Sequence, residues 1–231
     1  MTEPRTLFII PAYNESANIE RVLQELSEVA RPEEILVVSD GSTDNTAALT
    51  RRQPVALLEF PFNLGVASVM QAGFRYALRH GFTAAVQFDG DGQHVPGEAA
   101  KLLAALAAGD CDIAIGYRSG GERVSTLARH LGSKILAALL VLLTRRFYRD
   151  PTSGFRAFSR RAIEAFAKNF PEEYPEVESI VLAKKLGLRI RETPVTMRPR
   201  IAGKSSITVL GSAYYMVKVM LASLVIMLRR Y

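Results

Sequence analysis

The sequence is poor in the residues and motifs that mark several common classes of protein. Cys111 is the only cysteine among 231 residues, so no disulfide can form within the chain, and we expect a reducing compartment. Three histidines far apart in the sequence and one cysteine give no zinc-binding pattern. No secretory signal is predicted, because the apolar stretch Leu7–Ile10 stops at Pro11. These absences argue against a disulfide-stapled secreted domain and a structural zinc site.

Motifs for several other ligands and reactions are also missing. No GxGxxG follows the first expected strand, which disfavours a dinucleotide site, and no GxSxG nucleophile elbow occurs. Gly203-Lys204-Ser205 resembles the end of a P-loop, but Arg198 stands where that loop needs its first glycine. A calcium loop of the EF-hand type that began at Asp89 would need a glutamate where Ala100 stands.

The charge of the chain is positive and unevenly distributed. The sequence has 29 Lys and Arg against 23 Asp and Glu, a net charge of +6, with a pI near 9.6. Basic residues gather in Arg118–Arg161 and Lys184–Lys204, while Ile207–Leu228 carries one charge, Lys218. Basic residues beside apolar segments favour an anionic membrane surface or phosphorylated ligands over DNA. No nucleic acid partner is expected, because no basic and aromatic stacking platform is visible.

Short apolar runs alternate with helical patterns in the first half of the chain. Strands are expected at residues 7–10, 35–38, 55–58, 84–88 and 112–115. This alternation predicts an α/β fold with a mostly parallel central sheet and helices on both faces. No internal repeat is visible, and we expect one domain over residues 1–203, followed by an apolar C-terminal helix over residues 204–231.

Polar and glycine-rich segments follow four of the expected strands. They are PAYNE (11–15), SDGSTDNT (39–46), DGDGQH (89–94) and GYR (116–118). Because ligands of such sheets bind outside the carboxyl ends of the strands, these segments should converge on one site.

The acidic residues of these segments have two interpretations. Asp89 and Asp91 could present oxygens to Mg²⁺ or Mn²⁺, or could form a turn that leads into the next helix. Asp40 could accept hydrogen bonds from a base, or could belong to a turn with a helix cap. Two acidic turns at one sheet edge favour the functional interpretation, because like charges repel there unless a cation or a donor-rich ligand joins them.

As an ordered set, these motifs resemble those of the family 2 glycosyltransferases, and more closely the dolichol- and polyprenyl-phosphate sugar synthases. The resemblance runs from about residue 7 to residue 206 and also rests on NLG (63–65), SGFR (153–156), Arg129-x-x-x-Ser133 and Arg200-x-x-Gly203-x-Ser205. It implies a GT-A fold and an inverting transfer of a sugar from a UDP- or GDP-sugar to the phosphate of a polyprenyl lipid, with Mg²⁺ or Mn²⁺ as cofactor.

The resemblance also implies roles for residues of this sequence. The donor nucleotide would be bound by Pro11, Tyr13, Glu15, Asp40 and Asp89. The metal would have as ligands Asp89, Asp91 and Gln93. The acceptor and donor phosphates would meet Arg118, Arg129, Ser133, Arg200 and Lys204. Catalytic roles fall to Asp91, Arg118 and Asp150.

The chemistry agrees with this division of roles. Metal and guanidinium groups stabilise the negative charge that grows on a leaving nucleoside diphosphate, and arginine matches phosphate oxygens with a planar fork. A phosphate acceptor is anionic near neutral pH and needs no strong base, so Asp150 is a candidate base or acceptor-positioning residue, or else the structural partner of Arg156. In YPEVE (174–178), Glu176 and Glu178 would contact sugar hydroxyls, or else would form a solvated helix start.

The apolar C-terminal segment has three possible arrangements. Ile207–Leu228 would be about 33 Å long as a helix. We expect it to lie in the membrane interface beside the apolar stretch Ile135–Leu143, with a full span and a helix in a homo-oligomer core as alternatives. A single terminal helix resembles bacterial surface-polysaccharide enzymes that act on undecaprenyl phosphate, sometimes with a small membrane protein. The expected location is therefore the cytoplasmic face of the inner membrane.

Two other functions stay open on the sequence alone. The sugar could pass to a hydroxyl of a glycan or glycolipid in surface polysaccharide synthesis, a reaction that needs a carboxylate base. The chain could also be a catalytically silent membrane scaffold that organises other enzymes.

Overall fold

The fold is given by a computed structural model, which describes residues 5–119, 127–171, 174–199 and 209–229. The strands are β1 (Thr6–Ala12), β2 (Ile35–Asp40), β3 (Ala56–Phe60), β4 (Ala84–Gln87), β5 (Ile113–Arg118), β6 (Arg156–Ser159) and β7 (Ile190–Val195). The α-helices are α1 (Ile19–Leu26), α2 (Thr46–Thr50), α3 (Val66–Arg79), α4 (Ala99–Ala107), α5 (Leu127–Thr144), α6 (Arg160–Lys168), α7 (Pro175–Lys185) and α8 (Val209–Leu228). Short 3-10 turns occur at Pro32–Glu34 and Pro96–Glu98.

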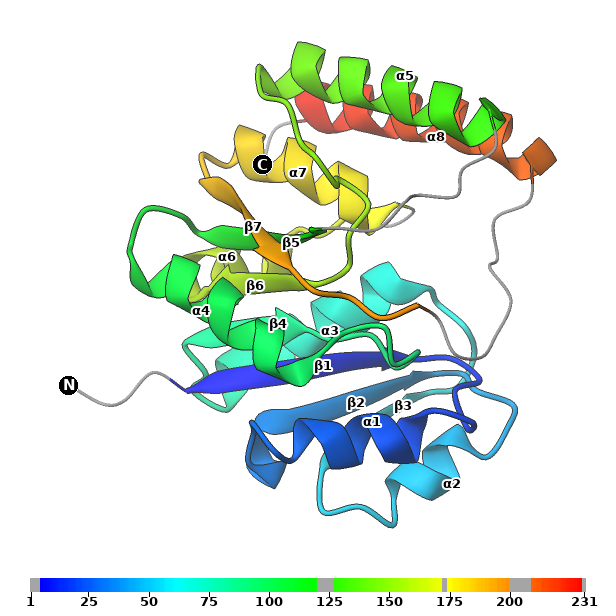
Figure 1. The fold of residues 1–231 in the computed structure, drawn as a ribbon, viewed down its shortest axis with the longest axis vertical. Helices are drawn as coiled ribbons and strands as arrows, with labels where there is room; N and C mark the ends of the chain where they lie inside the picture. The colour runs from blue at the N-terminus through cyan, green and yellow to red at the C-terminus, as the bar shows by residue number, and fades with distance from the viewer. Residues whose placement is uncertain (1–4, 120–126, 172–173, 200–208, 230–231) are drawn as a thin grey trace.

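The strands form one sheet in the order β3-β2-β1-β4-β6-β5-β7. β1 pairs in parallel with β2 and β4, β2 with β3, and β5 with β7, whereas β6 is antiparallel to both of its neighbours. Every strand except β6 therefore points the same way. This confirms the predicted α/β fold with a mostly parallel central sheet, which Figure 1 shows between two layers of helices. The five expected strands are present, and β6 and β7 are additional.

Both faces of the sheet are buried, and β1 shows why. Successive side chains of a strand point to opposite faces, so Leu7 and Ile9 belong to the core that includes α3, while Phe8 and Ile10 belong to the core that includes α1 and α4. A strand covered on both sides carries a continuous apolar run instead of an alternating one. That is the signal that marked residues 7–10 in the sequence.

The C-terminal helix, α8, packs against α5 and α7. Figure 1 shows α5 and α8 side by side at one end of the molecule. The side chain of Lys185 in α7 donates a hydrogen bond to the backbone oxygen of Met227 near the end of α8. The apolar stretch at 135–143 is the second half of α5. Among the helices that the structure describes, none is both long and apolar enough to cross a membrane. The domain boundary expected at 203–204 lies outside the described residues.

Candidate functional site

The segments PAYNE and SDGSTDNT, which begin in the last two residues of β1 and β2, are joined by hydrogen bonds. Asn14 has a left-handed backbone (φ 55°), and its N–H donates to Ser42 Oγ (3.2 Å) while its Oδ1 accepts from the N–H of Thr43 (2.9 Å). The N–H of Glu15 donates to Thr46 Oγ1 (2.8 Å). PAYNE and SDGSTDNT therefore form one surface at the carboxyl edge of the sheet, as the strand order requires.

Asp44 ties these two segments together through its carboxylate. Oδ2 accepts a hydrogen bond from the N–H of Ser16 (3.0 Å), and Oδ1 accepts from the N–H of Thr46 (2.9 Å) and from its hydroxyl. Burial raises the pKa of Asp44, but the hydrogen bonds from Thr46 and Ser16 outweigh burial and hold the pKa at about 2.

We expect Asp44 to make the stability of the chain depend on pH below pH 4. Its pKa is about 2 in the folded chain against an ordinary value of 3.8, so its contribution is complete above pH 4 and is lost as the pH falls through 2. Asp44→Asn should lower the free energy of unfolding at pH 7 and should flatten its decline between pH 4 and pH 2. Urea unfolding at a series of pH values measures both effects, and an unchanged decline in the variant would contradict this role.

Asp40, at the end of β2, holds the turn that leads into α3. Its buried carboxylate accepts hydrogen bonds from the backbone N–H groups of Leu64 (2.7 Å) and Gly65 (2.9 Å). NLG (63–65) is thereby fixed beside the other two segments. Asp40 therefore holds the start of α3 and not the helix that follows its own motif, and a contact between Asp40 and a nucleoside stays a prediction.

DGDGQH, after β4, folds against PAYNE. A Cβ atom on Gly90 would lie 3.1 Å from the backbone oxygen of Pro11, which is tighter than ordinary packing. The buried Asp91 accepts a hydrogen bond on Oδ1 from the N–H of Gln93 (3.0 Å). The three residues predicted to bind metal therefore lie on one short turn next to the predicted nucleotide-binding segment.

A loop from the second half of the chain reaches the same turn. A Cβ atom on Gly154, in SGFR, would lie 2.8 Å from Asp89 Oδ2, closer than side-chain carbons approach such atoms. The missing side chain at Gly154 therefore allows this loop to lie directly against the carboxylate of Asp89.

Arg156, two residues after Gly154, is a buried cation. Its guanidinium donates to Ser153 O (2.7 Å), to Pro151 O (2.8 Å) and to Ser179 Oγ in α7 (2.9 Å). Burial lowers the pKa of Arg156 to about 10, with the nearby Glu176 carboxylate opposing the change. Arg156 is therefore charged at neutral pH and joins the SGFR loop to α7.

Asp150 precedes this loop and is held from both sides. Its N–H donates to Glu192 Oε1 in β7 (3.0 Å), and its carboxylate accepts a hydrogen bond from the hydroxyl of Thr152 (3.1 Å). Asp150 therefore has a defined position beside the loop that carries Gly154.

The two glutamates of YPEVE differ in their surroundings. Glu178 is buried, and its Oε1 accepts a hydrogen bond from the N–H of Tyr174 (3.1 Å) at the start of α7. The alternative of a solvated helix start is therefore wrong for Glu178. Burial raises the pKa of Glu176, while the charge of Arg156 opposes that rise. Glu176 therefore interacts through its charge with the buried guanidinium of Arg156.

The other predicted site residues fall into two groups. Tyr13 is exposed in PAYNE, and Arg118 is exposed with a guanidinium nitrogen 4.0 Å from Met197 Sδ. GYR (116–118) forms the end of β5 instead of following it, because it pairs with residues 193–195 of β7. The second group lies outside the described part of the chain. For Arg129 and Ser133 in α5 this holds for the side chains, and for Arg200 and Lys204 it holds for the whole residues.

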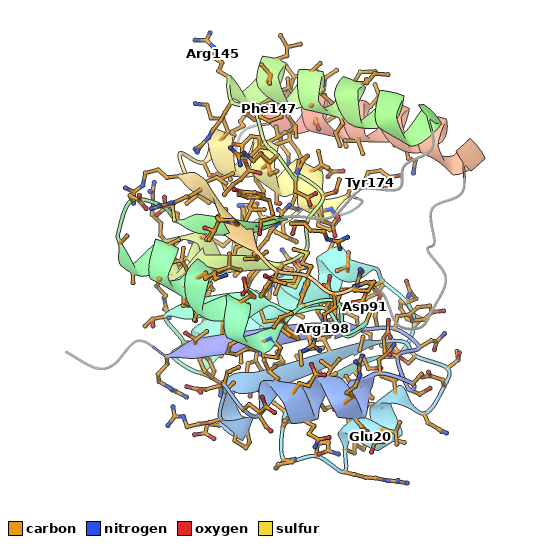
Figure 2. The ribbon with its side chains drawn as sticks, viewed as in Figure 1. Glu20, Asp91, Arg145, Phe147, Tyr174 and Arg198 are labelled. Atoms are coloured by element: carbon orange, nitrogen blue, oxygen red, sulfur yellow. The ribbon has the colours of Figure 1, made fainter. Side chains whose placement is uncertain are left out.

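Arg198 is a site residue that the sequence patterns did not indicate. Its N–H donates to Gln93 O (2.8 Å), and its own backbone oxygen accepts from Gln93 Nε2 (3.4 Å). Its guanidinium contacts Glu25 of α1 (2.6 Å). Figure 2 shows Arg198 and Asp91 on neighbouring segments. The segment before residue 200 is thereby attached to the DGDGQH turn, and no local pattern marks a pairing over such a sequence distance.

The turn after β4 suits a hard divalent cation. No group of three His, Cys, Asp or Glu side chains that could hold a metal occurs in the described part of the chain. Mg²⁺ and Mn²⁺ sites often use only one or two carboxylates and complete their shell with water and substrate phosphates. Asp89 and Asp91, with the amide oxygen of Gln93, match that donor set.

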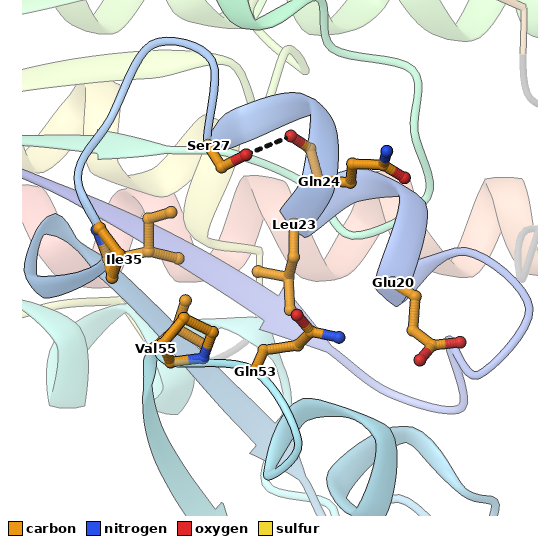
Figure 3. Close-up of a pocket in the computed structure, with 9 residues that line it drawn as sticks. Glu20, Leu23, Gln24, Ser27, Ile35, Gln53 and Val55 are labelled. Carbon is orange, nitrogen blue, oxygen red and sulfur yellow. Dashed lines mark hydrogen bonds between the residues drawn. The ribbon is translucent and has the colours of Figure 1, made fainter.

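Two shallow cavities lie away from this turn. One has a volume of about 500 Å³ and lies between α1 and the beginnings of β2 and β3. Figure 3 shows Leu23, Ile35 and Val55 in its wall. The other, of about 580 Å³, lies on the outer side of α3 and β3. Neither is lined by residues of DGDGQH or SGFR.

Comparisons with known proteins agree with this arrangement. Residues 7–187 match glycosyl transferase family 2. The polyprenol monophosphomannose synthase of Mycolicibacterium smegmatis is 32% identical over 88% of this chain and 81% of its own length. The undecaprenyl-phosphate mannosyltransferase of Micrococcus luteus is 30% identical over 88% of each chain.

A solved structure shares the fold at lower sequence similarity. The glucosyl-3-phosphoglycerate synthase of Mycobacterium tuberculosis, in complex with Mn²⁺ and UDP-glucose, superposes with a TM-score of 0.74 over 96% of this chain and 79% of its own, at 20% identity. This likeness confirms the GT-A fold expected from the sequence.

Proposed function

Because this chain belongs to glycosyl transferase family 2 and is a glycosyltransferase, we propose that it transfers a sugar from a nucleoside diphosphate sugar to the phosphate of a polyprenyl lipid, with the help of Mg²⁺ or Mn²⁺. One observation carries the proposal. PAYNE and SDGSTDNT on one side and SGFR on the other meet DGDGQH at one sheet edge, with Gly154 against Asp89. Two relatives with 30% identity or more are named for transfer to polyprenyl or undecaprenyl phosphate. The solved neighbour was crystallised with Mn²⁺ and UDP-glucose, which supports the same type of donor and cofactor here.

The residues divide between donor and acceptor. Pro11, Tyr13, Glu15 and Asp40 would hold the nucleoside, with Tyr13 stacked on the base. Asp89, Asp91 and Gln93 would hold the metal ion, which when bound offsets the charge of the diphosphate leaving group. Arg118, Arg129, Ser133, Arg200 and Lys204 would bind phosphate oxygens of the acceptor and the donor. Glu176 and Glu178 would lie on the sugar side.

The reaction needs little proton transfer. An acceptor phosphate oxygen forms a bond to the anomeric carbon as the bond from that carbon to the diphosphate breaks, so the configuration inverts and the nucleoside diphosphate leaves. The acceptor is already anionic, so a strong base is not required, and Asp150 would position the loop beside the acceptor without taking its proton. Positively charged side chains near both phosphates would stabilise the charge that moves onto the leaving group.

We also propose that α5 and α8 place the chain on the cytoplasmic face of the inner membrane. Exposed apolar side chains recur at helical spacing on both helices: Ile135 and Leu142 on α5, and Leu221, Leu224, Val225 and Leu228 on α8. An exposed arginine follows each helix, Arg145 after α5 and Arg229 after α8. Figure 2 shows Arg145 and the exposed Phe147 near the end of α5. An apolar surface with basic residues at its border is typical of a helix pair that lies in an anionic membrane interface.

Negative charges introduced among the exposed apolar side chains of α5 and α8 should weaken the binding of the chain to lipid vesicles. Leu142, which is 76% exposed, and Leu221 are replaced together (Leu142→Glu, Leu221→Glu). We expect the double variant to bind vesicles that contain anionic lipid at least about tenfold more weakly, as measured by co-sedimentation, because burying two carboxylates in the interface is unfavourable. Val29→Glu is the matched control, since Val29 is 48% exposed beyond the end of α1. Equal vesicle binding by all three proteins would contradict the membrane surface.

Turnover with defined substrates tests the main proposal. The purified chain is incubated with Mn²⁺ or Mg²⁺, undecaprenyl phosphate and a panel of UDP- and GDP-sugars that includes GDP-mannose. We expect one donor to give a lipid-linked sugar, and no product when undecaprenol replaces undecaprenyl phosphate. Transfer to undecaprenol, or to a glycan hydroxyl in place of the lipid phosphate, would overturn the phosphate acceptor. Donor binding without any transfer would favour the scaffold.

A further inference from the structure

A buried histidine closes the DGDGQH turn on itself. His94 is 3% exposed, and its Nδ1 accepts a hydrogen bond from the backbone N–H of Asp89 (3.0 Å). Its other ring nitrogen, Nε2, lies 3.4 Å from Asp89 Oδ2. One imidazole therefore contacts both the backbone and the carboxylate of the same residue, five positions before it in the sequence.

The hydrogen bond determines where the ring proton sits. Because Nδ1 accepts, the neutral imidazole carries its proton on Nε2, the ring nitrogen that lies 3.4 Å from the carboxylate oxygen. An Nδ1 that accepts a hydrogen bond carries no proton, so the ring is neutral in this arrangement. Burial lowers the pKa of His94, with Asp89 opposing that change. A neutral ring nitrogen within 3.4 Å of a carboxylate oxygen restricts where that carboxylate can lie without cancelling its charge.

The ring itself is held in place by its neighbours. It stacks on Phe155 with centroids 4.4 Å apart and planes at 15°, and it meets the edge of Phe88 at 5.4 Å and 81°. The backbone of His94 also forms an antiparallel bridge with Met197. Ring plane and backbone are therefore both held by contacts within the protein.

We propose that His94 is the positioning residue for Asp89, which it presents to the metal ion and the donor diphosphate in a single orientation. This inference rests on the proposed role of Asp89 as a metal ligand. Groups that orient the ligands of a metal commonly change metal affinity by about 10- to 100-fold when they are replaced. His94 fits that description, because both of its ring nitrogens contact Asp89, the proposed metal ligand.

Two substitutions separate the two contacts of the ring. Asparagine places an oxygen near the position of Nδ1 and can still accept from the N–H of Asp89, whereas glutamine places an N–H near the position of Nε2 and can still face the carboxylate. Both variants lose the aromatic stacking on Phe155, so each serves as the control for the other. The readouts are Mn²⁺ binding in the presence of UDP or GDP, the melting temperature, and the dependence of turnover on Mn²⁺ concentration.

For His94→Asn we expect Mn²⁺ binding about 10- to 100-fold weaker than in the wild type. Its turnover should recover at saturating Mn²⁺, because the fault lies in metal binding. His94→Gln should bind Mn²⁺ more tightly than His94→Asn, even if it melts at a lower temperature. Equal Mn²⁺ affinity in the two variants, or affinity that follows only the melting temperature, would overturn the inference and leave His94 a structural residue.

The same measurements separate this inference from the proposed function. If the wild-type chain binds Mn²⁺ and nucleotide but glycosylates no lipid phosphate, the acceptor proposal fails, and the difference between the two variants still decides the role of His94. If the wild-type chain binds no Mn²⁺ with either nucleotide, the metal role of Asp89 fails and the inference fails with it.

Discussion

Asp91→Ala is expected to reduce turnover by about 10³-fold while the chain stays folded. A bound divalent ion contributes several kcal/mol to the stabilisation of a diphosphate leaving group, and each 1.4 kcal/mol is a factor of ten in rate. Asp91 is buried on the DGDGQH turn, next to Asp89 and within hydrogen-bond distance of the N–H of Gln93. Loss of its carboxylate would remove one of the two negative ligands of the proposed metal site.

A second substitution at the same position distinguishes a metal ligand from a loop brace. Asp91→Asn keeps an oxygen that can accept from the N–H of Gln93, but it carries no charge. We therefore expect Asp91→Asn to lose nearly as much turnover as Asp91→Ala, and Mn²⁺ binding to weaken in both. Asp110→Ala is the control, since Asp110 is an exposed acid whose contact with Arg191 lies far from the turn. Wild-type turnover in Asp91→Asn would show that the carboxylate only braces the loop.

Gly41→Ala should produce the largest loss of stability among single substitutions at the site. Gly41 has φ +65°, and a Cβ atom there would lie 2.4 Å from the backbone carbon of Phe62 and 2.5 Å from the backbone nitrogen of Asn63. A left-handed conformation costs an alanine about 1 kcal/mol, and overpacking adds about 1–3 kcal/mol. Backbone atoms cannot move aside as the tip of a side chain can. We expect a total loss of about 3 kcal/mol in the free energy of unfolding.

Urea unfolding measures this loss, and another glycine supplies the control. Gly97 has open space around the position of a Cβ atom and no left-handed φ, so Gly97→Ala should change the free energy of unfolding by less than about 0.5 kcal/mol. Gly41→Ala should also weaken nucleotide binding, because the SDGSTDNT and NLG segments would have to separate. Equal stability of the two variants would mean that the turn at Gly41 adapts more easily than its backbone contacts indicate.

Much of the fold and part of the site follow from the sequence alone. Short, continuous apolar runs such as Leu7–Ile10 are typical of strands that are buried on both faces. A helix between two such strands allows them to lie parallel in one sheet. Parallel strands bring their carboxyl ends to one edge, so polar segments after β1, β2 and β4 had to meet there. The family also follows from the ordered motifs, and residues 7–187 match it.

Other features were decided only by the tertiary structure. β6 is four residues long and begins at the last residue of SGFR, so its sequence gives no separate strand signal. Its antiparallel direction is set by its pairing with β4 and β5, which no local pattern predicts. Arg156 donates to backbone oxygens and to Ser179, and no pattern of charges in the sequence marks such neutral partners. A solvated start of α7 was plausible from its acids, yet Glu178 is buried.

The sequence by itself determined the sheet, the family and the acidic turns that face one edge, because periodicity and motif order are local properties of a chain. The tertiary structure alone decided how those turns are held. Gln93 meets Arg198 and Gly154 meets Asp89 across long sequence distances, and His94 turns back onto Asp89 through a ring whose orientation depends on Phe155. Such contacts are set by backbone atoms and by side-chain packing, which leave no repeating signal in the order of residues.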